Sequence, residues 1–170
     1  MANRENHYES AFEQFLRERR VPYVAVDEAK RSLLADDAQS SLKSLDFLVS
    51  TSRGGGWLVD VKGRRFPSGA QKQYWKNWST QDDLVSLGRW ENVFGQRFGG
   101  LFVFAYEVVG KRAPLSSDKL FSYRGGLYAF VGIMLRDYVV HARRISARWD
   151  TVAMPTSQFR RLAEPLEAFL

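Results

Sequence analysis

Apolar side chains recur at helical spacing in two stretches, one near each end of the chain. In residues 5–20 the pattern predicts a helix, which Pro22 ends because proline cannot donate the next helical hydrogen bond. The apolar face of this helix holds Tyr8, Phe12, Phe15 and Leu16. A second stripe predicts a closing helix over residues 155–170. It consists of Phe159, Leu162, Leu166 and Phe169.

Between these helices the pattern changes to short apolar runs that predict strands. Residues 101–109 and 127–135 are almost wholly apolar, which is typical of strands buried on both faces. Residues 45–49 and 57–62 flank a glycine-rich turn and predict a β-hairpin. The remaining strand candidates are residues 23–26 and 148–153.

A third helix is predicted to follow the hairpin and to run to about Phe94. Ser79 or Thr80 can cap it, and Asp82 and Asp83 suit the positive end of its dipole. A short helix is predicted over residues 137–144, and three polar or irregular segments are predicted as loops, namely 28–43, 64–77 and 115–126. This order of helices and strands predicts an α/β fold with a mixed central β-sheet flanked by helices.

The composition limits the class of protein. With 170 residues, 45% of them hydrophobic and 14% aromatic, the chain can form one globular domain, residues 1–170, around a sizeable core. The absence of cysteine excludes disulfides and cysteine-ligated zinc, and is consistent with a reducing compartment. The longest apolar run is far shorter than the roughly 20 residues of a membrane-spanning helix. We therefore expect a cytoplasmic protein with no membrane partner.

Charge is unevenly distributed along the chain. The net charge is +6, yet residues 1–60 hold 8 Lys and Arg against 10 Asp and Glu. Residues 61–80 contain five cations and no carboxylate: Lys62, Arg64, Arg65, Lys72 and Lys76. A compact basic block of this kind favours a nucleic-acid partner, and we expect these five side chains to contact its backbone.

The predicted hairpin places two carboxylates opposite each other. Asp46 and Asp60 have their midpoint at Arg53, inside the turn, so an antiparallel hairpin closed there opposes them across the strands. Lys62 points to the same face as Asp60 because side chains alternate along a strand. A divalent cation would neutralise the repulsion between the two aspartates, and their hard oxygen ligands suit Mg²⁺ or Mn²⁺. The alternative is a solvated strand face with a surface ion pair between Asp60 and Lys62.

These residues resemble the motif of the PD-(D/E)xK nuclease superfamily. The motif reads Leu45-Asp46, thirteen intervening residues, then Asp60-Val61-Lys62, with leucine in place of the usual proline and aspartate in place of the commoner glutamate. The resemblance covers roughly residues 5–110. It implies a restriction-endonuclease-like fold, with Asp46 and Asp60 as metal ligands and Lys62 as the catalytic lysine.

Within that superfamily, the archaeal-type Holliday junction resolvases add a glutamate from the first helix. Glu9 is the matching position, with Glu13 as the alternative one turn later. The run from His7 to Glu13 also resembles the naming motif of the HYExAFE proteins, an uncharacterised bacterial family. The resemblance implies a magnesium-dependent nuclease acting on DNA, and it is compatible with a homodimer. A catalytically inactive nucleic-acid-binding domain of the same fold is the alternative.

Several other residues allow both a functional and a structural interpretation. His7 and His141 are expected to be ordinary helix residues. Gln81 is either a site residue, as in some relatives of the superfamily, or an exposed residue at the start of its helix. Trp75 and Trp78 either stack on nucleic-acid bases or fold the basic loop onto the core.

Overall fold

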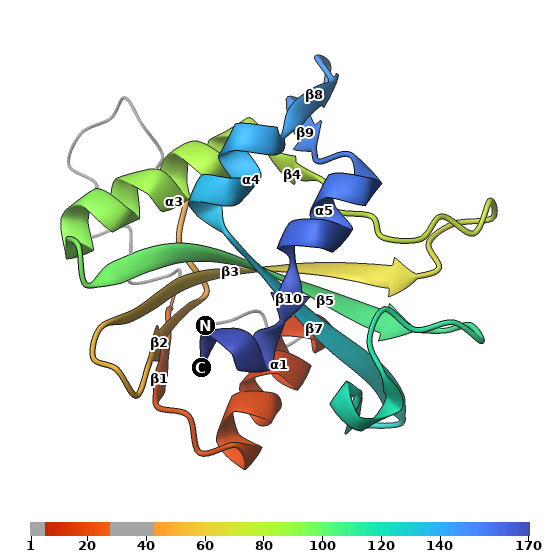
Figure 1. Ribbon diagram of the computed structural model, residues 1–170, viewed down its shortest axis with the longest axis horizontal. Helices are drawn as coiled ribbons and strands as arrows, with labels where there is room; N and C mark the ends of the chain where they lie inside the picture. The colour runs from red at the N-terminus through yellow and green to blue at the C-terminus, as the bar shows by residue number, and fades with distance from the viewer. Residues whose placement is uncertain (1–5, 28–42) are drawn as a thin grey trace.

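The computed structural model describes residues 6–27 and 43–170. Two layers of helices enclose a curved mixed sheet, and Figure 1 shows α1 on one side of it with α3, α4 and α5 on the other. Within the described residues the main sheet has seven strands, in the order β1-β2-β3-β5-β7-β10, with β6 paired to β7. A smaller sheet has the order β4-β9-β8. The predicted α/β architecture is therefore confirmed.

The helices and strands alternate along the chain in a mixed α/β order. The helices are α1 (His7–Glu18), α3 (Gln81–Phe94), α4 (Leu135–His141), α5 (Thr156–Leu162), and the 3₁₀ turns η1 (Ser117–Lys119) and η2 (Leu166–Phe169). The strands of the first half are β1 (Tyr23–Ala25), β2 (Phe47–Ser50), β3 (Gly56–Phe66), β4 (Ser79–Thr80) and β5 (Phe98–Val108). Those of the second half are β6 (Phe121–Tyr123), β7 (Gly126–Met134), β8 (Arg143–Ser146), β9 (Thr151–Ala153) and β10 (Glu164–Pro165).

The sheet separates two hydrophobic cores because side chains alternate along β3 and β5. Val59 and Val61 pack with Phe12 and Phe15 of α1. Leu58 packs on the opposite face with residues of α3, α4 and α5. We call these the α1 face and the α3 face.

Several predicted elements differ from the structure. The loop predicted over residues 64–77 begins too early, because β3 continues to Phe66 through its parallel pairing with β5. The predicted closing helix is wrong: α5 ends at Leu162, and the chain then forms β10 and η2. Pro165 explains the break, because proline disfavours helical backbone at the preceding residue and lacks the N–H that a helix requires.

The helix predicted over residues 137–144 extends too far, because α4 ends at His141 and β8 begins at Arg143. The segment predicted as a loop over residues 115–126 contains η1 and β6. The strand predicted at residues 148–153 is found as β9. The prediction of a loop over residues 28–43 falls, apart from Lys43, outside the described residues. None of the helices in the described part of the chain combines the length and apolar content that crossing a bilayer requires.

Candidate active site

The β2–β3 hairpin has the predicted register. Phe47 pairs with Val59 and Leu48 with Leu58. Asp46 lies one residue before the paired strand, where a continuation of this register would oppose it to Asp60. Two hydrogen bonds fix Asp46 there. Its backbone N–H donates to the Val59 carbonyl at 2.8 Å, and its Oδ2 accepts from the Val61 N–H at 2.7 Å. Asp46 therefore holds the backbone on both sides of Asp60.

Lys62 lies on the α3 face together with Asp60. Its Nζ is 2.9 Å from Asp60 Oδ1 and 2.9 Å from Asp83 Oδ2. The side chains of Lys62 and Asp60 are only 15% and 14% exposed, so this is not the solvated surface pair of the alternative interpretation. The Lys62 Nζ also lies 5.8 Å from the centre of the Phe102 ring, on the neighbouring strand β5. The ammonium group is thus confined between two carboxylates and an aromatic wall.

Asp83 is the residue of this cluster that the sequence interpretation missed. It completes a capping box with Thr80 at the start of α3, and its Oδ2 accepts from the Ser79 hydroxyl at 3.0 Å. Its Oδ1 lies 3.0 Å from Lys43 Nζ. The sequence signal was present, since an acidic residue three positions after a capping threonine is the pattern of a capping box. Nothing in the sequence showed that the same carboxylate would reach Lys62.

The carboxylates of the cluster fall into two electrostatic classes. Burial, followed by the charges of Asp60 and Glu9, raises the pKa of Asp46 well above its usual value. Burial also raises the pKa of Asp60, although Lys62 opposes the shift. Asp83 behaves in the opposite way. Burial would raise its pKa, but Lys62, the Thr80 N–H and Lys43 together lower it below its usual value.

Lys62 remains a cation in this setting. Burial alone lowers the pKa of its ammonium group, but Asp60 and Asp83 outweigh that cost, and the pKa is raised above its usual value. In this cluster, neighbouring charges favour the ionised forms of Lys62 and Asp83. The ionised forms of Asp46 and Asp60 are costly to bury.

Glu9 approaches from the other side of the sheet. Its helix covers the α1 face, whereas Asp60 and Lys62 lie on the α3 face. Glu9 Oε1 accepts from Asn6 Nδ2 at 2.6 Å, and its charge helps raise the pKa of Asp46. The neighbouring Tyr8 ring fits against Gly63, where a Cβ would lie 2.1 Å from the ring. Only glycine permits that approach, which brings the start of α1 close to β3.

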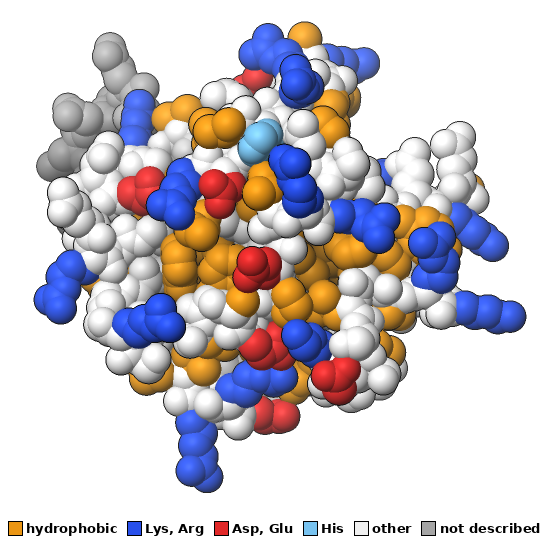
Figure 2. Space-filling model, viewed as in Figure 1, with side chains coloured by type: hydrophobic (Ala, Val, Ile, Leu, Met, Phe, Trp, Pro, Cys, Tyr) orange, Lys and Arg blue, Asp and Glu red, His pale blue; other side chains and the backbone are white. Residues whose placement is uncertain are grey.

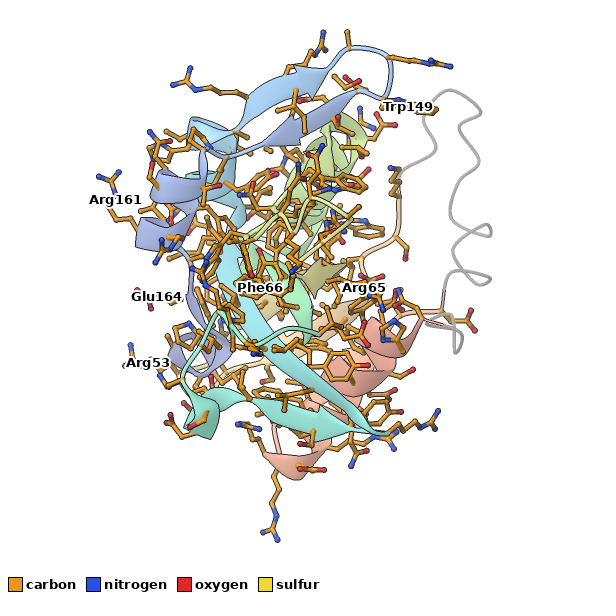
Figure 3. The ribbon with its side chains drawn as sticks, turned by 90° about the vertical axis from the view of Figure 1, so that its right-hand side faces the viewer. Arg53, Arg65, Phe66, Trp149, Arg161 and Glu164 are labelled. Atoms are coloured by element: carbon orange, nitrogen blue, oxygen red, sulfur yellow. The ribbon has the colours of Figure 1, made fainter. Side chains whose placement is uncertain are left out.

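The five cations of the basic block are spread over different environments. Arg64 is half-buried, its guanidinium lies 3.9 Å from the centre of the Trp78 ring, and its Nη2 donates to the Trp78 carbonyl. Burial lowers the pKa of Arg64. Arg65 is exposed and lies 3.7 Å from Glu107; Figure 3 shows it beside the buried Phe66. Lys72 is exposed, and Lys76 is partly buried with its carbonyl bonded to Tyr106.

The remaining candidates occupy separate places. His7 Nδ1 lies 2.8 Å from the Tyr128 hydroxyl, and His141 is the last residue of α4. Gln81 is exposed at the start of α3. Trp75 packs against the core beside Phe66, which matches the loop-folding interpretation, while Trp78 is 38% exposed.

The donor set at the centre of the cluster fits a hard divalent cation. Asp46 and Asp60 supply carboxylate oxygens, and burial raises the pKa of each, so a cation between them would favour their ionised forms. Within residues 6–27 and 43–170, no three histidine, aspartate or glutamate side chains lie together closely enough to hold an ion by themselves. Mg²⁺ commonly keeps several water ligands and takes only one or two carboxylates from a protein. Two aspartates are therefore a sufficient protein contribution.

Comparisons with known proteins identify the fold. The chain is similar to the solved structure of Hjc, a Holliday junction resolvase from the archaeal hyperthermophile Archaeoglobus fulgidus. The TM-score is 0.54 at 12% identity, over 95% of this chain and 96% of that one. No protein-family model matches the sequence, and no curated protein is similar to it. The fold is restriction-endonuclease-like, as the motif implied.

Proposed function

We propose that the protein is a metal-dependent nuclease that hydrolyses phosphodiester bonds in DNA. The observation that carries the proposal is the register of the β2–β3 hairpin, whose continuation by one residue would oppose Asp46 to Asp60, together with the ion pair of Lys62 and Asp60. The similarity of the fold to that of a Holliday junction resolvase supports the same interpretation. Mg²⁺ or Mn²⁺ is the proposed cofactor, with Asp46 and Asp60 as its protein ligands, while Glu9 on the side of α1 adds negative charge near Asp46.

Each group of side chains has a separate role in this proposal. A divalent ion at this position would make a bound water more acidic and would stabilise negative charge on the phosphate. Lys62, held protonated between Asp60 and Asp83, is suited to steady the phosphate and orient the attacking water rather than to accept a proton. Asp83 keeps Lys62 in place and does not need to touch the substrate. Arg64, Arg65, Lys72 and Lys76 are the proposed contacts to the nucleic-acid backbone.

Cleavage assays on labelled duplex, single-stranded and four-way-junction DNA test the proposal. Wild type should cleave with Mg²⁺ or Mn²⁺ and not with a chelator. Asp60→Asn should lower the rate by at least about 100-fold, since an amide is a poor ligand for a hard cation. Asp82→Asn is the matched control, because Asp82 precedes Asp83 in the first turn of α3 but is exposed.

Thermal melts give a readout that does not depend on turnover. Mg²⁺ should raise the melting temperature of wild type and of Asp82→Asn, but not that of Asp60→Asn, because only a folded metal site gains stability from the ion. Tight DNA binding by wild type without cleavage in either metal would overturn the proposal. It would favour an inactive nucleic-acid-binding domain instead.

A further inference from the structure

The hairpin formed by β8 and β9 is a basic projection with an unburied tryptophan. Figure 1 shows it extending from the body above α4 and α5, and in Figure 2 Lys and Arg side chains gather on it. Its cations are Arg143, Arg144 and Arg148, all exposed. Trp149 is 67% exposed, with the Arg148 guanidinium 5.0 Å from the centre of its ring. Figure 3 shows Trp149 at the hairpin end of the molecule, far from the buried Phe66.

The base of this hairpin is rigid. Asn77, only 4% exposed, accepts from the Met154 N–H at 2.8 Å and donates to the Met154 carbonyl at 3.1 Å. The buried Tyr138 hydroxyl donates to the Asn77 carbonyl at 2.7 Å and also contacts the Val152 carbonyl at 3.2 Å. These buried polar contacts fix β9 to the segment that leads into β4.

The hairpin is also connected directly to the candidate active site. Thr151 of β9 pairs with Thr80 of β4, and the Gln81 N–H donates to the Asp150 carbonyl at 3.0 Å. Thr80 caps the helix turn that carries Asp83, the partner of Lys62. Trp149 immediately precedes Asp150, whose carbonyl bonds to the first residue of α3. The same helix carries Asp83, which pairs with Lys62 of the site.

A groove of about 480 Å³ runs between the basic loop and the hairpin. Lys76 and Trp78 line it from the loop, and Ile145 and Met154 line it from the hairpin side. Trp78 also stacks on Arg64, two residues beyond Lys62 on β3. Cations and aromatic rings thus lead from the site to this groove, whose far wall belongs to the hairpin side.

We propose that the β8–β9 hairpin is a nucleic-acid-binding arm, in which Trp149 stacks on an unpaired base while the arginines contact the backbone. Aromatic side chains bind single strands because every unstacked base offers a face, and arginine adds charge and cation–π attraction. A base within an intact duplex offers no such face. The inference rests on the proposed function and narrows the substrate to DNA with an unpaired segment near the cleavage site.

A second copy of the chain is a poorer occupant of this surface. A symmetric interface on this surface would bury three arginines from each copy, whereas the centres of stable interfaces are depleted in charge. Asp150 is the one carboxylate between Arg143 and Asp150, and it already pairs with Arg144 at 3.2 Å. The net positive charge of the hairpin is complementary to phosphate.

Binding measured without metal tests the arm independently of cleavage. Fluorescence anisotropy in a chelator would compare a blunt DNA duplex with the same duplex carrying a single-stranded tail. Trp149→Ala should weaken binding to the tailed duplex by roughly tenfold or more, given the usual contribution of one stacked base. Binding to the blunt duplex should barely change. Trp149→Phe, which keeps a ring, should retain most of the preference for the tail.

Arginine variants separate the arm from general basic charge. Arg148→Ala should weaken binding to both duplexes and reduce the salt dependence by about one phosphate contact. Arg136→Ala is the matched control, because Arg136 is 77% exposed but lies at the start of α4, outside the hairpin, and it should have little effect.

Two outcomes would overturn the inference. One is equal binding of the tailed duplex by wild type and Trp149→Ala, with both proteins folded. The other is a wild-type dimer that Trp149→Ala converts to a monomer with DNA affinity unchanged, which would assign the surface to self-association. Loss of the tail preference in Trp149→Ala, together with a wild type that never cleaves, would retain the arm and reject the nuclease.

Discussion

The two faces of the central sheet are built differently. The α1 face is packed by apolar and aromatic residues, with Phe12 between the rings of Phe47 and Phe130 at 5.1 and 5.6 Å. All the buried polar residues of the described chain belong instead to the segment from the basic loop into α3: Asn77, Ser79, Asp83 and Ser86. Both faces are held by apolar packing, but the α3 face also places charges where burial strengthens their interactions.

This contrast shows how the fold supports a site. Burying a charge is costly unless it is paired, so the α3 face contains its own compensation. Asp83 is bonded to Lys62, Lys43, Ser79 and the Thr80 N–H. Asp46 and Asp60 have less compensation, as their raised pKa values show. The pair of Lys62 and Asp83 anchors α3 to the sheet. A bound cation would compensate the charges of the other pair, Asp46 and Asp60.

The largest effect should follow from a change in the α1 face. Phe12→Ala should cost about 3–5 kcal/mol of unfolding free energy, because it removes a fully buried ring and leaves a cavity. The loss should be the same at pH 4 and pH 7, since no ionisable group is involved. Denaturant unfolding at both pH values measures it. A strongly pH-dependent loss would show that the α1 face is electrostatically coupled to the site.

Asp83→Asn should have the next largest effect. Removing this charge leaves Lys62 and Lys43 without their shared partner, and should cost about 3 kcal/mol at pH 7. Because folding lowers the pKa of Asp83, its contribution is present above about pH 4 and is lost as the pH falls further. The difference from wild type should therefore narrow in acid.

The exposed Asp82 provides the control for this prediction. Asp82→Asn should change the unfolding free energy by no more than about 0.5 kcal/mol, as expected for a surface substitution. Urea titrations from pH 3 to pH 7 compare the two variants. Equal stability of Asp83→Asn and Asp82→Asn at pH 7 would mean that the Lys62–Asp83 pair does not hold the α3 face together.

Asp46→Asn should have a smaller effect than Asp83→Asn, and of opposite sign. Folding raises the pKa of Asp46, so ionising this carboxyl group destabilises the metal-free protein as the pH rises above about 4. The amide oxygen can still accept from the Val61 N–H, and the variant should be about 1 kcal/mol more stable than wild type at pH 7. The gain should disappear near pH 3.

Melts in a chelator measure this gain, and added Mg²⁺ should reverse the order by stabilising only the wild type. A variant that is less stable than wild type at pH 7 without metal would contradict the prediction. It would mean that the Asp46 carboxylate is already compensated in the folded protein.

The sequence alone determined the β2–β3 hairpin and the positions of Asp46 and Asp60 relative to its turn. The midpoint of Asp46 and Asp60 at Arg53 predicts the observed register, because strand pairing and side-chain alternation are local rules. The helix beginning at Gln81 followed from its capping residue in the same way. The resemblance of this motif to a known nuclease superfamily implied the fold, which the similarity to the Hjc structure supports.

Only the tertiary structure decided how distant segments meet. Asp83 reaches Lys62 across 21 positions because the β3–α3–β5 crossover folds α3 back onto the sheet, and no local pattern encodes that distance. The same applies to Glu9, whose helix covers the opposite face, and to Trp149, whose strand β9 pairs with β4 and so joins the site. Local spacing sets which residues share a strand face, whereas the packing of helices on the sheet sets which charges become neighbours.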